Sequence, residues 1–125
     1  MIPVKELRIG NWVIINGQYI HMDLKMFHAV LMGFEGYIPD PIPLTAEMLE
    51  KCGFIKHDID SNLYQSSPEL HEKSNKDIGI VAPSFFFNKR LNRWMDCQTR
   101  VCIDSLHQLQ NLYLDLTSEE LEIKL

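Results

Sequence analysis

The sequence has few cysteines, and they do not occur in the patterns in which cysteines usually work together. Cys52, Cys97 and Cys102 are an odd number, and no two of them form a CxxC pair. Small secreted proteins held by disulfides usually carry an even number at short spacings. We therefore expect three thiols that act as small hydrophobic groups, in a protein of a reducing cytoplasm.

Metal-binding and catalytic patterns are also missing. Structural zinc sites pair their ligands two to four residues apart in two knuckles, and no second knuckle accompanies the histidine and cysteine clusters of this chain. The sequence contains no GxSxG, P-loop, HExxH or GxGxxG motif. A cysteine and a histidine that meet only in space remain an open route to covalent catalysis. We expect no metal, no cofactor and no enzymatic activity. The clusters considered are Cys97-x4-Cys102-x4-His107, and His57 with Asp58 and Asp60.

Long apolar runs and an excess of basic charge are absent too. No run approaches the 18 or so residues that span a bilayer, and the opening MIPVKELRIG lacks the apolar core of a signal peptide. The chain has 12 basic and 17 acidic residues, a formal net charge of −5. Binding to nucleic acid or to an anionic membrane over the whole surface is therefore not favoured, although a local basic patch remains open. We expect a cytoplasmic protein without membrane contact.

The 125 residues, 46% hydrophobic and 23% charged, fit one domain over 1–125, with possible sub-structure at 1–40 and 44–125. In the first part, residues 12–15 and 18–22 are typical of two strands. Asn16-Gly17 between them is the favoured dipeptide of a two-residue hairpin loop, because both positions need positive φ. The apolar run 28–34 predicts a third strand.

The rest of the chain predicts a short helix, several strands and a longer helix. The helix at 44–53 has Thr45 as N-cap and Gly53 at its end, with Met48, Leu49 and Cys52 facing a core. Strands are predicted at 63–65, 78–82 and 99–103, a hairpin at 84–97, and a final edge strand at 121–125. The fold class is α+β, an antiparallel sheet with one C-terminal helix packed on it. That helix begins at Asp104 or Ser105, and its apolar face comprises Leu106, Leu109, Leu112, Tyr113 and Leu116.

Three blocks carry a resemblance to known proteins. Residues 1–13 (MIPVKELRIGNWV), 41–54 (PIPLTAEMLEKCGF) and 106–125 (LHQLQNLYLDLTSEELEIKL) resemble small proteins, of no established activity, that are common in gut Bacteroidota and their phages. The resemblance implies a phage, prophage or other mobile-element gene in a bacterial cytoplasm. Those proteins usually read LTGEEL where this chain has Ser118, which predicts either a left-handed serine or an early start to the last strand.

A second, weaker resemblance concerns the N-terminus alone. The pattern L-x-I-G-N-W-V, followed by a hairpin and V-L-M-G-F, is similar to the opening of the SH3-like barrels of KOW-type nucleic-acid modules. It implies that residues 1–40 close into a small barrel. The alternative is an open β-meander that contributes only to the core.

Residues 85–100 form the first candidate site, because aromatic and basic residues alternate there with a single acid. Basic side chains neutralise phosphates and aromatic rings stack on unpaired bases. A solvated turn over a buried aromatic strand explains the same residues, so both interpretations stay open. The candidate contacts are Lys89, Arg90, Arg93, Trp94 and Arg100.

The second candidate is a stripe of polar residues, His107, Gln110 and Asn111, opposite the apolar face of the last helix. Amides donate and accept hydrogen bonds without the desolvation cost of full charges, so they suit a partly buried surface. They serve either to bond covering backbone of the same chain or to meet a partner. The preferred functional hypothesis is a non-enzymatic accessory protein that binds another protein, and the alternative is a nucleic-acid-binding accessory module that uses the 85–100 hairpin.

Overall fold

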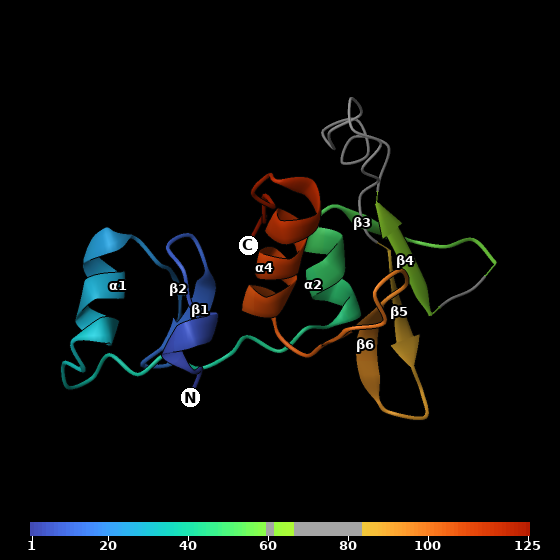
Figure 1. Ribbon diagram of the computed structural model, residues 1–125. Coiled ribbons are helices and arrows are strands. Elements are labelled where there is room, and N and C mark those ends of the chain that lie inside the picture. Colours follow the sequence, from blue (N-terminus) through green and yellow to red (C-terminus); the bar gives the residue numbers. More distant parts are fainter. Residues whose placement is uncertain (60–61, 67–83) are drawn as a thin grey trace.

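The computed structural model describes residues 1–59, 62–66 and 84–125. Helix α4 stands at the centre of the molecule, with a small N-terminal unit on one side and a larger α+β unit on the other (Figure 1). The elements, in chain order, are η1 (Val4–Glu6), β1 (Trp12–Ile15), β2 (Gln18–His21), α1 (Leu24–Leu31), α2 (Ala46–Lys51), β3 (Phe54–Lys56), β4 (Leu63–Ser66), β5 (Phe85–Asn88), β6 (Arg93–Asp96), β7 (Cys102–Ile103) and α4 (Leu106–Thr117).

The N-terminal unit is a two-stranded hairpin followed by a helix. Strands β1 and β2 pair in the predicted register, and Asn16 and Gly17 both take positive φ in the loop, at 53° and 76°. The predicted third strand at 28–34 is wrong, because most of this run lies in α1, whose N-cap Asp23 accepts a hydrogen bond from the Met26 amide. Residues 1–40 therefore hold a two-stranded sheet and a helix, and the barrel hypothesis is wrong.

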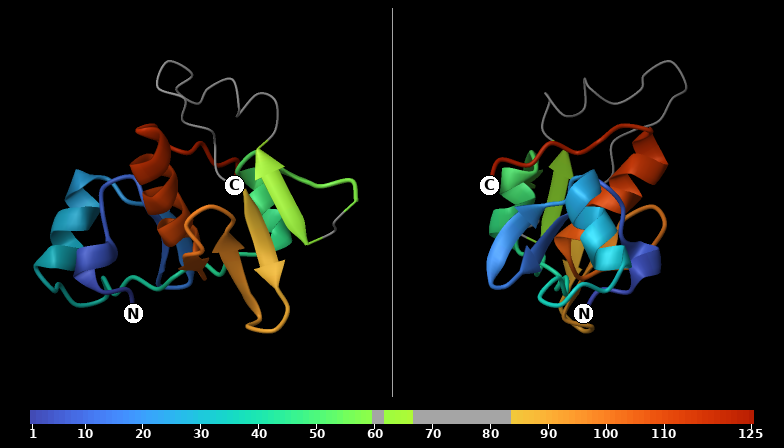
Figure 2. Two further views of the ribbon diagram at one scale, coloured as in Figure 1. Left: turned by 45° about the vertical axis from the view of Figure 1, so that its right-hand side comes forward. Right: turned by 90° about the vertical axis from the view of Figure 1, so that its left-hand side faces the viewer.

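The larger unit is an antiparallel meander of five strands in the order β3-β4-β5-β6-β7. Helices α2 and α4 lie on the same side of this sheet (Figures 1 and 2). The 84–97 hairpin and the strand at 63–65 are confirmed, and the strand predicted at 99–103 is confirmed only at Cys102–Ile103. The α+β class, with the C-terminal helix packed on the sheet, is thus the observed architecture. The strand predicted at 78–82 lies outside the described residues.

Helix α2 forms where its local signals predict it. The Thr45 hydroxyl accepts a hydrogen bond from the Met48 amide at 3.1 Å, which satisfies one free N–H of the first turn. Gly53, with φ of 94°, turns the chain out of the helix and into β3. Met48, Leu49 and Cys52 are buried, as predicted, so the helix packs its apolar side onto the sheet.

Two separate hydrophobic clusters hold the two units. The larger lies between the five-stranded sheet and helices α2 and α4, and its fully buried members include Phe54, Phe85, Leu109 and Tyr113. The smaller lies within the N-terminal unit and comprises Ile2, Leu7, Val13, Ile15, Met22 and Val30. At the junction between the units, Trp12 and Ile14 of β1 pack against the larger cluster, and polar side chains of α4 add hydrogen bonds.

The chain beyond α4 is not a strand, so the edge strand predicted at 121–125 is wrong. Leu121 is buried and Ile123 is half-buried, and the Lys124 amide donates a backbone hydrogen bond to the Lys51 carbonyl of α2. Ser118 ends α4 with φ of 60°, the left-handed conformation named above as one of two outcomes. Among the described residues, no helix is long and apolar enough to cross a membrane.

Candidate functional site

The polar side of α4 binds backbone groups of the N-terminal unit. Gln110 is 2% exposed, and its side-chain oxygen accepts a hydrogen bond from the Trp12 amide at 2.8 Å. Its side-chain nitrogen donates to the Gly10 carbonyl at 2.9 Å. One buried amide thus satisfies a donor and an acceptor of the chain segment that enters β1, as a neighbouring strand would.

Asn111 and Arg8 each form two further hydrogen bonds that link the N-terminal unit to α4 and the residues after it. The Asn111 nitrogen donates to the Glu6 carbonyl at 2.7 Å, and its oxygen accepts from the Asn11 side chain at 2.9 Å. Arg8 reaches the other way, donating to the Gln110 carbonyl at 3.0 Å and to the Glu120 carboxylate at 2.6 Å. We call this set, with Gln110, the polar clasp.

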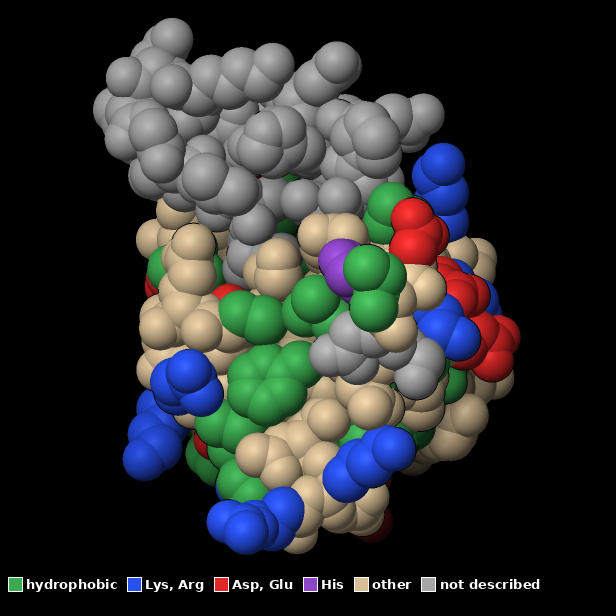
Figure 3. Space-filling model, turned by 90° about the vertical axis from the view of Figure 1, so that its right-hand side faces the viewer, with side chains coloured by type: hydrophobic (Ala, Val, Ile, Leu, Met, Phe, Trp, Pro, Cys, Tyr) green, Lys and Arg blue, Asp and Glu red, His purple; other side chains and the backbone are tan. Residues whose placement is uncertain are grey.

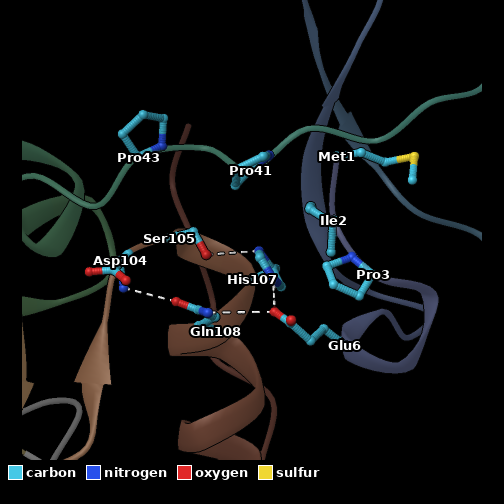
Figure 4. Close-up of a pocket in the computed structure, with 10 residues that line it drawn as sticks. All are labelled: Met1, Ile2, Pro3, Glu6, Pro41, Pro43, Asp104, Ser105, His107 and Gln108. Carbon is cyan, nitrogen blue, oxygen red and sulfur yellow. Dashed lines mark hydrogen bonds and ion pairs between the residues drawn. The ribbon is translucent and has the colours of Figure 1, made fainter.

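His107 adjoins the clasp and is buried between two side-chain partners (Figure 4). Its Nε2 lies 3.1 Å from a Glu6 carboxylate oxygen and its Nδ1 lies 2.9 Å from the Ser105 hydroxyl. An ionised carboxylate can only accept, so the neutral ring carries its proton on Nε2 and accepts at Nδ1 from the serine. Burial lowers the pKa of His107 from its ordinary value, and the bond to Glu6 offsets only part of that effect.

A cavity of about 310 Å³ lies beside this histidine. Its walls are apolar residues of the N-terminus, prolines of the linker and the first turn of α4, as Figure 4 shows. Glu6, His107 and Ser105 form a hydrogen-bonded series of carboxylate, imidazole and hydroxyl, the order in which a histidine acts as general base toward a serine. However, the Ser105 residue is only 3% exposed, and both ring nitrogens already have partners: Nε2 bonds Glu6 of η1, and Nδ1 bonds Ser105 at the start of α4. The geometry fits a structural bond better than attack on a substrate.

The polar stripe of the sequence is therefore a contact within the chain. His107 and Gln110 are buried and Asn111 is half-buried, and all three meet residues 6–12. This arrangement agrees with the intramolecular alternative. Sequence reasoning missed the partners Glu6, Gly10 and Asn11, which lie about 100 positions away. The one indication in the sequence was that the two sides of the polar clasp lie in blocks 1–13 and 106–125, which both carry the resemblance.

The aromatic and basic residues of the hairpin do not gather into one contact surface. Trp94 is 9% exposed and packs its ring against Tyr64 and Phe87 on the helix side of the sheet. Arg93 is held by two hydrogen bonds to the Asp104 carboxylate, at 2.9 Å and 2.7 Å, and these bonds lower the pKa of that carboxyl. Trp94 is thus unavailable to stack on a base. The remaining candidates, Lys89, Arg90 and Arg100, are exposed.

A different surface lies on the side of the sheet opposite α2 and α4, where the described residues place no helix. Cross-strand register places Leu63 opposite Phe86, Phe86 opposite Met95, and Met95 opposite Cys102. These four half-buried side chains form one row over four strands, because residues paired in register share a face. We call this surface the outer face. Figure 3 shows hydrophobic side chains across its centre, Lys and Arg side chains toward the left and bottom, and a mixture of Asp, Glu, Lys and Arg side chains at the right edge.

Two turns border the outer face at opposite ends of β6, and side chains fix both. In the turn before β6, the Asn88 side-chain oxygen accepts from the Arg90 and Leu91 amides. In the turn after β6, the buried Asp96 carboxylate accepts from the amide and the hydroxyl of Thr99. Arg90 and Arg100 are therefore presented from ordered backbone.

The three cysteines are free thiols in different surroundings. Cys52 is buried in the larger core, and desolvation raises the pKa of its thiol to about 12. Cys97 and Cys102 are half-buried. In the described parts of the chain, no group of three or more His, Cys, Asp or Glu side chains could hold a metal ion, and Asp60 lies outside those parts.

Comparison of the chain with protein-family models, with curated proteins and with solved structures finds no match in any of the three.

Proposed function

We propose that this protein is a non-enzymatic binding module that takes a protein partner on the outer face of its five-stranded sheet. The observation that carries the proposal is the row Leu63–Phe86–Met95–Cys102, four apolar side chains in cross-strand register on the side of the sheet away from α2 and α4. Leu91 and Val101, in the turns that border the row, are 50% and 49% exposed. Apolar rows of this kind lose water favourably when a second protein covers them.

A protein partner fits this face better than nucleic acid does. Sequence-tolerant binding of single strands depends on aromatic rings that stack on bases. Phe86 is the one aromatic side chain in the row, and the indole of Trp94 packs into the core on the other side of the sheet. The formal net charge of −5 further disfavours a polyanion as the general partner. A methionine such as Met95 suits protein interfaces, since its unbranched side chain adapts to the shape it meets.

The biological setting of the proposal comes from the resemblance alone. Proteins with similar first, central and last blocks imply an accessory protein encoded by a phage or mobile element. The partner would then be a phage or host protein in the bacterial cytoplasm. In this view the variable interior of the chain supplies the binding face, while the resembling blocks build the clasp and the core behind it.

Affinity capture with matched variants tests the proposal. The tagged chain is incubated with a Bacteroidota lysate in three forms: wild type, Phe86→Ser and Tyr19→Ser. Tyr19 is 51% exposed on β2, in the other unit, so its variant controls for the loss of an aromatic surface residue. We expect at least one protein that wild type and Tyr19→Ser recover equally and Phe86→Ser loses. Equal recovery by all three forms of every bound protein, with each form folded, would refute binding at the outer face.

Single-stranded nucleic acid is the second candidate, because Lys89 and Arg90 lie in the turn beside the row and Arg100 lies in the opposite turn. If a fluorescent oligothymidylate binds at low salt, its affinity should fall steeply as salt rises. For three phosphate contacts, the logarithm of the binding constant should fall by about two for each tenfold rise in salt concentration. No binding at 20 mM salt would eliminate this candidate.

A further inference from the structure

Three exposed cations border the outer face, in addition to Arg93, which is paired with Asp104. Lys89, Arg90 and Arg100 are all exposed, and none of them forms an ion pair with another residue in the ranges that the structure describes. The chain as a whole is acidic, so three exposed cations beside one apolar row are not the average surface of this protein. A partner that covers the row would leave these cations facing its own surface.

We propose that the outer face binds an extended acidic segment of the partner, with a large apolar residue at its centre and carboxylates toward both ends. The inference rests on the proposed function and adds the chemistry of the partner to it. The apolar residue would lie on Phe86 and Met95. The carboxylates would meet Lys89 and Arg90 at one end and Arg100 at the other.

The dimensions of β6 set the length of this segment. Arg90 precedes the strand Arg93–Asp96 and Arg100 follows it, so the two cations lie beyond its opposite ends. Four residues of strand extend about 13 Å. The row crosses β5 and β6 between those ends. An extended segment parallel to β6 therefore needs about five to seven residues, and only every second side chain faces the sheet. The predicted pattern is an acid, an apolar residue two positions later, and an acid two or four positions after that.

The backbone at Arg100 supports this assignment independently of its charge. Arg100 has φ of 62°, a left-handed conformation that glycine and asparagine adopt at lower cost than arginine does. The turn holds this conformation through the Asp96 carbonyl, which accepts from the Arg100 amide, and through the Asp96 carboxylate bonds to Thr99. A long cationic side chain at a position where glycine would relieve strain points to a use for that side chain.

A selection from random peptides tests the proposal without knowledge of the natural partner. A library of random 12-residue peptides displayed on phage is selected against the wild-type chain and, separately, against Arg90→Ser/Arg100→Ser. The Lys25→Ser variant is the matched control, since Lys25 is an exposed cation on α1 in the other unit. We expect peptides enriched on wild type and on Lys25→Ser to carry the acid–apolar–acid pattern. Synthetic copies of them should bind the double variant at least about tenfold more weakly.

The other outcomes of the selection distinguish a failure of this inference from a failure of the proposed function, protein binding at the outer face. Enriched peptides that need Phe86 but lack acids, or that bind the double variant equally, would overturn the acidic segment and leave a protein-binding face. Peptides that bind Phe86→Ser as well as wild type would overturn both proposals. Oligothymidylate that binds wild type and not the double variant, with no acidic peptides enriched, would assign the same cations to nucleic acid and also overturn the inference.

Discussion

Replacing Gln110 with alanine should destabilise the protein more than any comparable change on the same helix. The substitution removes the partners of the Trp12 amide and the Gly10 carbonyl, which Gln110 bonds from a position that is 2% exposed. A buried backbone group left without a partner costs about 1–3 kcal/mol. Two such groups give about 2–6 kcal/mol, a large part of the roughly 6–19 kcal/mol expected for a chain of this length.

Gln108→Ala is the matched control, because it makes the same change in the same helix at a half-buried side chain. Gln108 accepts from the Asp104 amide and lies 3.5 Å from Glu6, contacts that water can replace in part, so we expect a loss of about 1 kcal/mol or less. Urea unfolding followed by circular dichroism measures both free energies of unfolding. If the two variants differ by less than about 0.5 kcal/mol, the Gln110 bonds carry no net stability and the clasp account is wrong.

Three further predictions follow from His107, from Ser118 and from the cysteines. The pKa of His107 is lowered in the folded state, so as pH falls the unfolded chain takes up a proton at His107 before the folded chain does. The free energy of unfolding should therefore fall as pH drops below about 6.5, the ordinary pKa of histidine. Urea titrations from pH 7.5 to 5 should show this decrease, and His107→Gln should make it smaller. Ser118→Gly should raise the free energy of unfolding by about 0.5–1 kcal/mol in the same assay, since glycine adopts the φ of 60° without the strain of a side chain; a loss of stability would contradict the left-handed cap. A thiol reagent at pH 8 should label Cys97 and Cys102 in the folded protein and Cys52 only on unfolding. The reason is that Cys52 is 2% exposed and its thiol has a pKa of about 12. Rapid labelling of all three thiols in the folded protein would contradict the burial of Cys52.

The elements that could be predicted from the sequence are those whose cause is local. Asn16-Gly17 needs only positive φ at two adjacent positions, and Thr45 needs only the free amide of Met48 three residues on. Helix α4 repeats its apolar residues over twelve positions, long enough for the helical period to be clear. Each of these predictions depends on residues within a few positions of one another.

Helix α1 shows where local reasoning fails. The run 28–34 is short and apolar, and such a run has the same composition in a buried strand and in a helix. The deciding residue was Asp23, whose carboxylate caps the helix one residue before Leu24. Once the helix starts there, Ala29 and Val30 are buried and Leu31 and Met32 are exposed, a one-sided burial that a helix explains.

The candidate sites were harder to predict because they depend on distant residues. Nothing near Gln110 in the sequence indicates that it bonds Gly10 and Trp12, since the partners lie in another unit of the fold. The outer face likewise depends on strand register, which brings Phe86 and Met95 together and turns Trp94 to the other side. The sequence identified the residues of interest in both regions, and the three-dimensional pairing decided which of them contact solvent.

The most direct test of the outer face as a binding surface is hydrogen exchange in a complex. The wild-type chain is measured with and without an acidic peptide recovered from the selection, and amide protection is compared between β5–β6 and α1. The account predicts slower exchange over residues 85–103 and unchanged exchange over Leu24–Leu31. Protection confined to α1, or protection of residues 85–103 that persists in Phe86→Ser with the peptide at the same concentration, would contradict it.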